Sequence, residues 1–492
     1  DITITADDFQ AGATVTVQAG SLTATVTNDS AVTGDILVQG GGITITQSGG
    51  ANQGFSSNGG TNGMVADNDI TITAQQATLD EVKTVAGNLT ISATNDITIA
   101  ANATTDISGS ITLTSTNADH VSGDTATAIT TTGILLADND ITITANDAVA
   151  VGKVQTIKGN VAITAGNEID FATTASDVNG TLTVTSTNAA AGDGNGFIDV
   201  DVALVVDNDV TITAAEIDAE AAITSNKDDI VMTVTNDINL ASTTTATAGD
   251  VTIAVTGTVG MDLVVAADAT GLITAANDVT ISADDVTVGD IVSSAAGNVV
   301  ITANNDITAT GDITTNTGSG SITITSNKAW VNGAAGITLS DGETLDADND
   351  VTITAASGAE IVMGSAAINS SAKGDIKITG GDIDGSGNIT ATLGNVQLNS
   401  TNDSETSTLG GTITADAGSI TTLGGKYAIS DLDANAGGIS IAGDSQGSFG
   451  ALQTTGSSVR ITSSNSTQGT TGDVSITSID SPTVLAQGAG DY

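Results

Sequence analysis

Residues 66–74 read ADNDITITA, and the same nine letters return at residues 137–145. Near-copies are VDNDVTITA at 206–214, AANDVTISA at 275–283 and ADNDVTITA at 347–355, and the chain itself begins with DITITA. In each copy, apolar Ile or Val alternates with Thr or Ser, which is the two-residue period of a β-strand with two different faces. The Asp and Asn residues before the strand are turn formers. The motif therefore predicts a turn followed by a short strand.

One aspartate stands immediately before the strand in every copy, at Asp1, Asp69, Asp140, Asp209, Asp278 and Asp350. Successive members of this series are separated by about 70 residues throughout, and so regular a period indicates internal repetition. Two further strand-like phrases follow each aspartate, for example LTISATND at 89–96 and SITLTST at 110–116. Each super-repeat of about 70 residues thus divides into three units of roughly 20, 21 and 29 residues, a period typical of repeat architectures.

Short strands at a spacing of about 20 residues are typical of a β-solenoid, in which each coil buries its apolar side chains only by stacking on its neighbours. We predict an all-β fold, a right-handed parallel β-helix with about 20–29 residues per coil, the hand being the usual one for parallel crossovers. Residues 1–350 would form five regular super-repeats and residues 351–492 less regular coils. A string of β-sandwich domains is the alternative, although a unit of about 70 residues is small for a sandwich.

The charge balance excludes several kinds of partner. Nine Lys and Arg residues face 57 Asp and Glu residues, a net charge of −48, so the chain repels nucleic acid and anionic membrane surfaces. No run of 18 apolar residues is present, which argues against membrane insertion. The chain contains no cysteine and begins at Asp1 inside a repeat. We therefore expect a fold without disulfides, in a processed chain or a segment of a longer one.

Catalytic chemistry is poorly supported by the residue types. His120 is the single histidine, and without a second histidine or a cysteine no Ser/His/Asp or Cys/His arrangement can be assembled. The nine basic residues are scattered, whereas β-helical enzymes that cleave polysaccharides place Lys or Arg beside clustered carboxylates. We expect a protein that is not an enzyme, with a carbohydrate-active β-helix enzyme as the alternative that the fold permits.

The repeated Asp-Asn-Asp motif is the candidate metal site. Carboxylate oxygens at alternate positions suit Ca²⁺, although the glycine and glutamate of an EF-hand loop are missing. The competing interpretation is an Asx turn that leads the chain into the strand. The candidate calcium ligands are Asp67, Asp69, Asp138, Asp140, Asp207, Asp209, Asp346, Asp348 and Asp350.

The spacing of the aspartates that immediately precede the strands suggests a further role, the separation of negative charges. Coils stack about 4.8 Å apart, so an aspartate on every third coil would have its nearest like charge about 14 Å away, beyond the Debye length of about 8 Å. The intervening corners are mostly Asn, Ser or Gly, with Asp250 as an exception, and Asn and Ser there could instead form ladders of hydrogen bonds between coils. Duplication of a three-coil unit explains the period equally well.

Phrases such as NDITITA and GNLTISA resemble the repeats of secreted filamentous-haemagglutinin-type proteins and of β-strand-repeat surface proteins of bacteria. The resemblance covers nearly the whole chain, although these motifs mainly encode coil geometry. It implies a right-handed parallel β-helical shaft, export to the cell surface, and a role in adhesion or in an extracellular matrix.

Two functions remain open on this basis. The first is an extracellular structural protein that associates with itself, end to end or laterally, into a surface fibre, sheath or matrix. The second is an adhesin shaft that binds glycans or other cells through lateral loops, for which the long segments 116–137 and 186–206 are the candidates.

Overall fold

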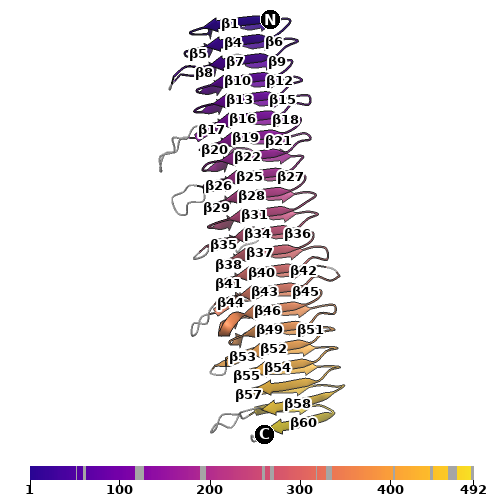
Figure 1. Cartoon of the computed structure of the whole chain (residues 1–492). Coiled ribbons are helices and arrows are strands. Elements are labelled where there is room, and N and C mark those ends of the chain that lie inside the picture. Colours follow the sequence, from indigo (N-terminus) through magenta and orange to yellow (C-terminus); the bar gives the residue numbers. More distant parts are fainter. Residues whose placement is uncertain are drawn as a thin grey trace. The chain divides into compact units, whose positions relative to one another are not determined.

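The computed structural model describes residues 1–50, 53–58, 62–116, 127–188, 196–257, 261–265, 271–316, 318–328, 335–402, 405–443, 447–463 and 474–488. The chain divides into two compact units, Asp1–Ser242 (unit 1) and Thr243–Tyr492 (unit 2). Each unit is a parallel β-solenoid in which the chain passes in turn through three sheets, here named A, B and C. Figure 1 shows the strands of each unit stacked coil upon coil.

In unit 1, the described strands number eleven in sheet A, eleven in sheet B and ten in sheet C. Sheet A contains β1 (Ile2–Ala6), β4 (Leu22–Val26), β7 (Ile43–Gln47), β10 (Ile70–Ala74), β13 (Leu89–Ala93), β16 (Ile111–Ser115), β19 (Ile141–Ala145), β22 (Val161–Ala165), β25 (Leu182–Ser186), β28 (Val210–Ala214) and β31 (Ile230–Val234). Sheet B contains β2 (Gln10–Ala11), β5 (Ser30–Val32), β8 (Phe55–Ser57), β11 (Ala77–Leu79), β14 (Ile97–Ile99), β17 (Thr127–Thr131), β20 (Ala148–Val151), β23 (Ile169–Phe171), β26 (Phe197–Val200), β29 (Glu216–Ala219) and β32 (Ile238–Leu240). Sheet C contains β3 (Val15–Val17), β6 (Ile36–Val38), β9 (Met64–Ala66), β12 (Val82–Thr84), β15 (Ala103–Thr105), β18 (Ile134–Ala137), β21 (Lys153–Thr156), β24 (Ser176–Val178), β27 (Leu204–Val206) and β30 (Ile223–Ser225).

Unit 2 repeats this arrangement. Sheet A contains β34 (Val251–Val255), β37 (Val279–Ala283), β40 (Val299–Ala303), β43 (Ile322–Ser326), β46 (Val351–Ala355), β49 (Ile376–Gly380), β52 (Val396–Ser400), β54 (Ile420–Gly424), β56 (Ile439–Gly443), β58 (Ser458–Ser463) and β60 (Thr483–Gly488). Sheet B contains β35 (Asp262–Val265), β38 (Asp285–Val288), β41 (Ile307–Ala309), β44 (Ala335–Leu339), β47 (Glu360–Val362) and β50 (Ile383–Asp384). Sheet C contains β33 (Thr244–Ala246), β36 (Ile273–Ala275), β39 (Ile291–Ser293), β42 (Ile313–Thr315), β45 (Thr344–Ala347), β48 (Ala367–Ser370), β51 (Ile389–Ala391), β53 (Thr406–Ala415), β55 (Lys426–Ala434), β57 (Gly447–Gln453) and β59 (Val474–Asp480). A turn of 3-10 helix, η1 (Ala356–Gly358), follows β46.

The alternating pattern of the motif builds the core. In β10, Ile70 and Ile72 are 0 % exposed, whereas Thr71 and Thr73 lie on the outer face. In the neighbouring strand, Leu89 pairs with Ile70 and Ile91 pairs with Ile72. Burial of one such branched side chain contributes about 1.5–3 kcal/mol relative to its exposure, and each coil gains this only when a neighbour covers it.

The register confirms the three-coil super-repeat. Ile70 pairs with Leu89, Leu89 with Ile111 and Ile111 with Ile141, so two short coils are followed by a longer one before the motif returns. All of these pairings are parallel, which confirms the predicted parallel β-solenoid and excludes the sandwich alternative. The right-handed sense stays a prediction.

The long coils do not differ from the short ones in the way that the sequence suggested. The interpretation of segments 116–137 and 186–206 as lateral loops is wrong for much of their length, because they contain β17, β18, β26 and β27. Ile129, Leu135, Ile198 and Leu204 in these strands are 0 % exposed, so they complete the core of their coils. Residues 117–126 and 189–195 lie outside the described part of the chain.

The coils become less regular near the end of unit 2. The strand β50 is the last described strand of sheet B, and β53, which follows β51 in sheet C, is ten residues long. Its pairing with β55 shifts register between Leu409 and Thr412. Tyr427 in β55 is 4 % exposed, and its hydroxyl donates to the Leu423 carbonyl at 2.7 Å and accepts from the Ser400 N–H at 2.7 Å. Tyr427 therefore packs into the wall of the coil.

Candidate functional site

At most corners, the side chain immediately before a sheet A strand joins successive coils. Asp69 Oδ1 accepts the backbone N–H of Asn88 at 2.8 Å, and Asn88 Oδ1 accepts the N–H of Ser110 at 3.0 Å. We call this series the corner ladder. The remaining rungs, written as acceptor and donor, are Asp1–Ser21, Ser21–Gly42, Asp140–Asn160, Asn160–Thr181 and Asp209–Asp229 in unit 1, and Asp250–Asp278, Asp278–Asn298, Asn298–Ser321, Ser321–Asp350, Asp350–Asp375, Asp375–Asn395, Asn395–Ser419 and Ser419–Gly438 in unit 2.

In three copies of the Asp-Asn-Asp motif, the first aspartate binds the preceding coil. Asp67 Oδ2 accepts the N–H of Gly40 at 2.6 Å, and Asp138 Oδ2 accepts the N–H of Ser108 at 2.9 Å, both in the preceding coil. Asp348 accepts the N–H of Gly318 in the same manner. The middle Asn supports this contact, since Asn139 Nδ2 donates to the Ser108 carbonyl at 2.7 Å.

Two first aspartates also bind a lysine of the following coil. Lys158 Nζ lies 3.1 Å from Asp138 and Lys227 Nζ lies 2.6 Å from Asp207. Hydrogen bonds from Lys227, and then from Asn226, hold the pKa of Asp207 below its usual range. These lysines are 68 % and 62 % exposed, so each pair contributes at most about 1 kcal/mol.

The directions of the two carboxylates differ between copies, since Asp207 and Asp209 both bind the following coil. In the copy at 67–69, Asp67 contacts the coil before and Asp69 the coil after. Asp346, half-buried in β45, has a pKa raised by burial and then by Asp348. These contacts account for the spacing of the motif by hydrogen bonding between coils, and calcium binding by the nine aspartates stays a prediction.

The aspartates of the corner ladder are only partly separated from one another by the expected three coils. Aspartates occupy adjacent coils at Asp209 and Asp229, at Asp250 and Asp278, and at Asp350 and Asp375. The proposed separation of one aspartate per three coils is thus wrong at these positions. The reason is that each carboxylate accepts an N–H of the next coil, which offsets repulsion across the stacking distance.

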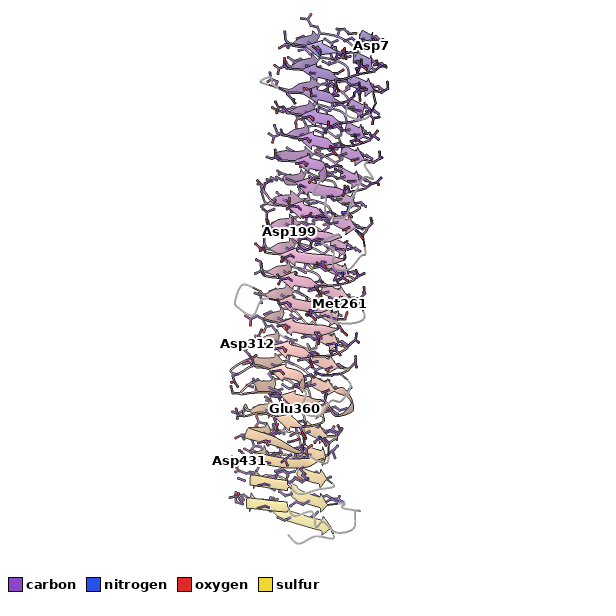
Figure 2. The ribbon with its side chains drawn as sticks, turned by 90° about the vertical axis from the view of Figure 1, so that its left-hand side faces the viewer. Asp7, Asp199, Met261, Asp312, Glu360 and Asp431 are labelled. Carbon is purple, nitrogen blue, oxygen red and sulfur yellow. The ribbon has the colours of Figure 1, made fainter. Side chains whose placement is uncertain are left out.

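One group of three carboxylates in the described part of the chain is close enough to share a metal ion, and it lies away from the Asp-Asn-Asp motifs. Oxygens of Asp170, Asp199 and Asp201 in unit 1 lie within 4.8 Å of one another. Asp170 of β23 pairs with Asp199 of β26, which pairs with Asp218 of β29, so outward aspartates stack on three consecutive coils. Asp199 is labelled in Figure 2. Sequence reasoning missed this group, although IDF at 169–171 and IDV at 198–200 share an aspartate flanked by inward apolar residues.

Burial and like charge perturb this group. Burial, followed by the charges of Asp201, Asp170 and Asp218 and a hydrogen bond with Asp201, raises the pKa of Asp199 to about 6. The pKa of Asp170 is raised by burial and then by Asp201 and Glu168, and its buried Oδ1 has no hydrogen-bond partner. No lysine is among the groups that shift either pKa. The cluster therefore favours a proton or a bound cation.

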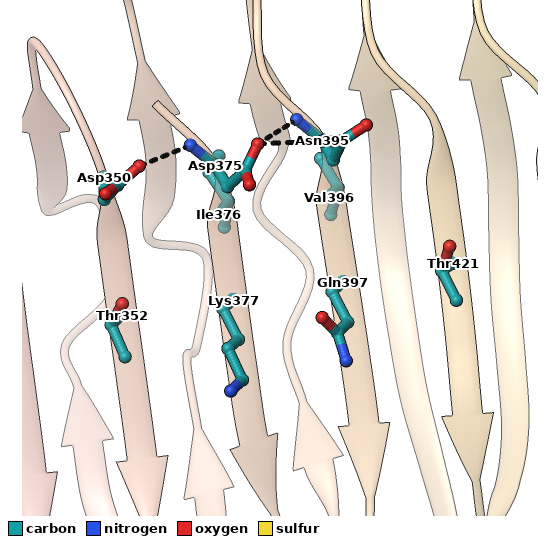
Figure 3. A pocket seen from close by; sticks show the side chains of 9 residues that line it. All are labelled: Asp350, Thr352, Asp375, Ile376, Lys377, Asn395, Val396, Gln397 and Thr421. Carbon is teal, nitrogen blue, oxygen red and sulfur yellow. Dashed lines mark hydrogen bonds between the residues drawn. The ribbon is translucent and has the colours of Figure 1, made fainter. Parts of the chain in front are cut away.

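A shallow groove of about 390 Å³ lies on sheet A of unit 2. Thr352, Lys377, Gln397 and Thr421 are register partners on four adjacent strands and form its floor (Figure 3). Its rim is a stretch of the corner ladder, in which Asp350 accepts the N–H of Asp375, and Asp375 accepts both the N–H and the side-chain amide of Asn395 (Figure 3). Lys and Gln here replace the threonines of the surrounding coils, so the groove offers donors and acceptors to a polar ligand.

Comparison with known proteins adds no assignment. No protein-family model, curated protein or solved structure matches this chain. His120 and Trp330 lie outside the described residues. In the described part of the chain, no helix has the length and apolar character needed to cross a membrane.

The corner ladder predicts a specific mutational result. Asp140→Ala removes the acceptor for the Asn160 N–H and should lower the free energy of unfolding by about 1 kcal/mol, the usual net value of such a bond. Asp140→Asn keeps an acceptor oxygen and should recover most of this loss. Urea unfolding followed by circular dichroism measures both. Equal losses in the two variants would show that charge, rather than the hydrogen bond, is responsible.

The carboxylate cluster predicts a pH dependence. Because the pKa of Asp199 rises from 3.8 to about 6, the folded chain binds more protons than the unfolded chain between these values. Its contribution to the free energy of unfolding should therefore fall as the pH rises from about 4 to about 6. Asp199→Asn should flatten this slope and be more stable than the parent above pH 6, with the difference vanishing at low pH. Parallel pH profiles of parent and variant would contradict this assignment.

Proposed function

We propose that this chain is a non-enzymatic structural protein whose β-solenoid associates with itself to build an extracellular fibre, sheath or matrix. The main support for this proposal is that successive coils place the same residue types at paired positions. In β10 and β13, threonine stacks on threonine at Thr71 and Thr90, and isoleucine stacks on isoleucine at Ile72 and Ile91. A coil of a second copy could therefore add with the same contacts that join coils within one copy.

The outermost described strands of sheet A show what such a contact would bury. Ile2 in β1 is 38 % exposed, and Val484 in β60 is 48 % exposed. Equivalent inward residues elsewhere in the sheet, such as Leu22 and Ile43, are 0 % and 1 % exposed. A further coil, from another copy or from the same polypeptide, would cover these apolar side chains. The extracellular location rests on the resemblance of the repeats to bacterial surface proteins.

Self-association can be tested at β1. The parent chain should form particles whose mass rises with concentration in light scattering and which appear as elongated assemblies by electron microscopy. The double variant Ile2→Lys, Ile4→Lys places charge on the inward row of β1 and should keep the mass of a single copy. Thr3→Lys, on the outward face of the same strand, is the matched control and should still assemble. A parent chain that remains a single copy at all concentrations, with or without Ca²⁺, would overturn the proposal.

A second function is favoured by the groove on unit 2. We propose as the alternative that the shaft binds a glycan there, because Lys377, Gln397 and the flanking Asp and Asn side chains supply the hydrogen bonds that sugar hydroxyls require. This function does not depend on the segments once interpreted as lateral loops.

A glycan array of the parent chain tests this alternative. Any glycan bound should lose affinity by roughly tenfold or more in Lys377→Ala with Gln397→Ala, because two polar partners are removed. Thr142→Ala, on the same face of sheet A in unit 1, should bind like the parent. Absence of binding to every glycan, or equal binding by the double variant, would argue against the groove as a glycan site.

A further inference from the structure

Threonine forms two rows along the outer face of sheet A in unit 1. Each of the eleven strands of this sheet is five residues long, and its second and fourth side chains lie on the outer face, as Thr71 and Thr73 do in β10. Parallel pairing places like positions next to one another from coil to coil, so the strands stacked in Figure 1 carry two continuous rows. Apart from Ser92, Ala162 and Val231, every position in the two rows is threonine. We call them the threonine rows.

The threonine rows differ in composition from the outer faces of the other two sheets. All their residues are described, and none of them is charged, in a chain with a net charge of −48. The outward positions of sheet B in unit 1 include Asp170, Asp199 and Asp218, and those of sheet C include Lys83 and Asp177. Threonine is a common outward residue on any strand, but a general preference of that kind would act on all three sheets alike. The uncharged rows are therefore a property of this face.

The geometry of this face is more regular than that of sheet B. None of the pairings among the sheet A strands of unit 1, all of them described, shifts register. In sheet B, by contrast, the pairing of β17 with β20 shifts between Thr127 and Ile129. At ordinary strand dimensions, neighbours within a row lie about 4.8 Å apart and the two rows lie about 6.6 Å apart. Threonine is stiff at χ1, so the face is an ordered two-dimensional array of methyl and hydroxyl groups.

A regular, uncharged array restricts the kind of partner. A charged mineral surface would find no opposite charge in the rows. A crystalline polysaccharide is bound best by aromatic side chains that stack on its sugar rings, and none of these described strands contains Phe, Tyr or Trp. Ordered water needs neither feature, because a hydroxyl group both donates to and accepts from water. Ice presents water molecules on a lattice whose repeats along two perpendicular directions are comparable to the spacings of the rows.

We propose that the threonine rows of unit 1 bind the surface of ice. Each side chain makes one weak contact, and repetition over eleven strands adds these contacts together. The solenoid holds the side chains in place before contact, so adsorption orders few of them and its entropic cost is low. The rows lie on the side of the coils and not on their exposed ends. Ice binding therefore depends neither on self-association nor on glycan binding.

Thermal hysteresis of the full chain tests the proposal. This is the gap between the temperature at which a small ice crystal melts and the lower temperature at which it begins to grow. The parent should open a gap that widens with protein concentration. The double variant Thr112→Lys, Thr183→Lys places long charged side chains in the first row, on β16 and β25, and should lose most of the gap. The two lysines are three coils apart, about 14 Å, which exceeds the Debye length of about 8 Å, so their mutual repulsion is screened.

Thr98→Lys with Thr224→Lys is the matched control. These threonines are outward residues of β14 in sheet B and β30 in sheet C, so the change in charge is the same and the threonine rows are intact. This variant should keep the gap of the parent. Circular dichroism should show that both double variants melt close to the parent. The variant Ile2→Lys, Ile4→Lys, which is expected to block self-association, should also keep the gap.

Three results would overturn ice binding by the threonine rows. The first is a parent chain that opens no gap at any concentration. The second is an equal gap in the two lysine double variants, because the effect would then not depend on the rows. The third is a Thr112→Lys, Thr183→Lys variant whose particle mass falls in light scattering while its gap equals that of the parent. That result would show that the rows join copies of the chain.

Discussion

Most coils of this solenoid depend on a hydrogen bond at the corner where the next coil enters sheet A. The side chain before the strand accepts a backbone N–H of the next coil there, as when Asp69 accepts the N–H of Asn88. A backbone N–H without a partner costs about as much as a lost hydrogen bond, which favours Asp, Asn or Ser at the corner, although Gly42 and Thr181 also occupy this position. With the corner satisfied, the strand starts at a fixed residue, and Ile70 and Ile72 stack on Leu89 and Ile91. The corner contact thus supports the register of the core in the coils that have it.

The same constraint explains why the long coils tolerate extra residues. Stacking requires only that the corner and the inward rows coincide, so coils of unequal length can stack. Ile111 and Ile141 pair directly although the coil between them is longer than the one that separates Ile70 from Leu89. This is why the super-repeat can contain coils of unequal length and still maintain three parallel sheets in each unit.

Much of this architecture follows from local pattern, and the remainder depends on contacts between coils. The strand period, the spacing of the super-repeat and the turn role of Asp-Asn-Asp are all readable in residues 66–74 and their copies, because they involve neighbours in sequence. The direction in which each aspartate points is not readable there, since Asp67 and Asp69 are alike in sequence but face opposite coils. The pairing of Asp170 with Asp199 was missed because a long coil brings them together, and the segment between them lacks the repeated motif. Strands β17 and β26 were mistaken for loops for the same reason.

The excess of acidic residues has two different physical settings in this fold. At the corners, a carboxylate faces a backbone N–H, and a charge-assisted hydrogen bond offsets the repulsion of its neighbours. On sheet B, an outward aspartate such as Asp199 faces the next aspartate in register, and no N–H is free there because the ladder of the sheet uses it. The pKa of Asp199 rises in this second setting, and that of Asp382 rises where burial adds to the same effect. The effect of a carboxylate in this solenoid therefore depends on its position on the coil, and its pKa rises where it meets other carboxylates in place of a backbone N–H.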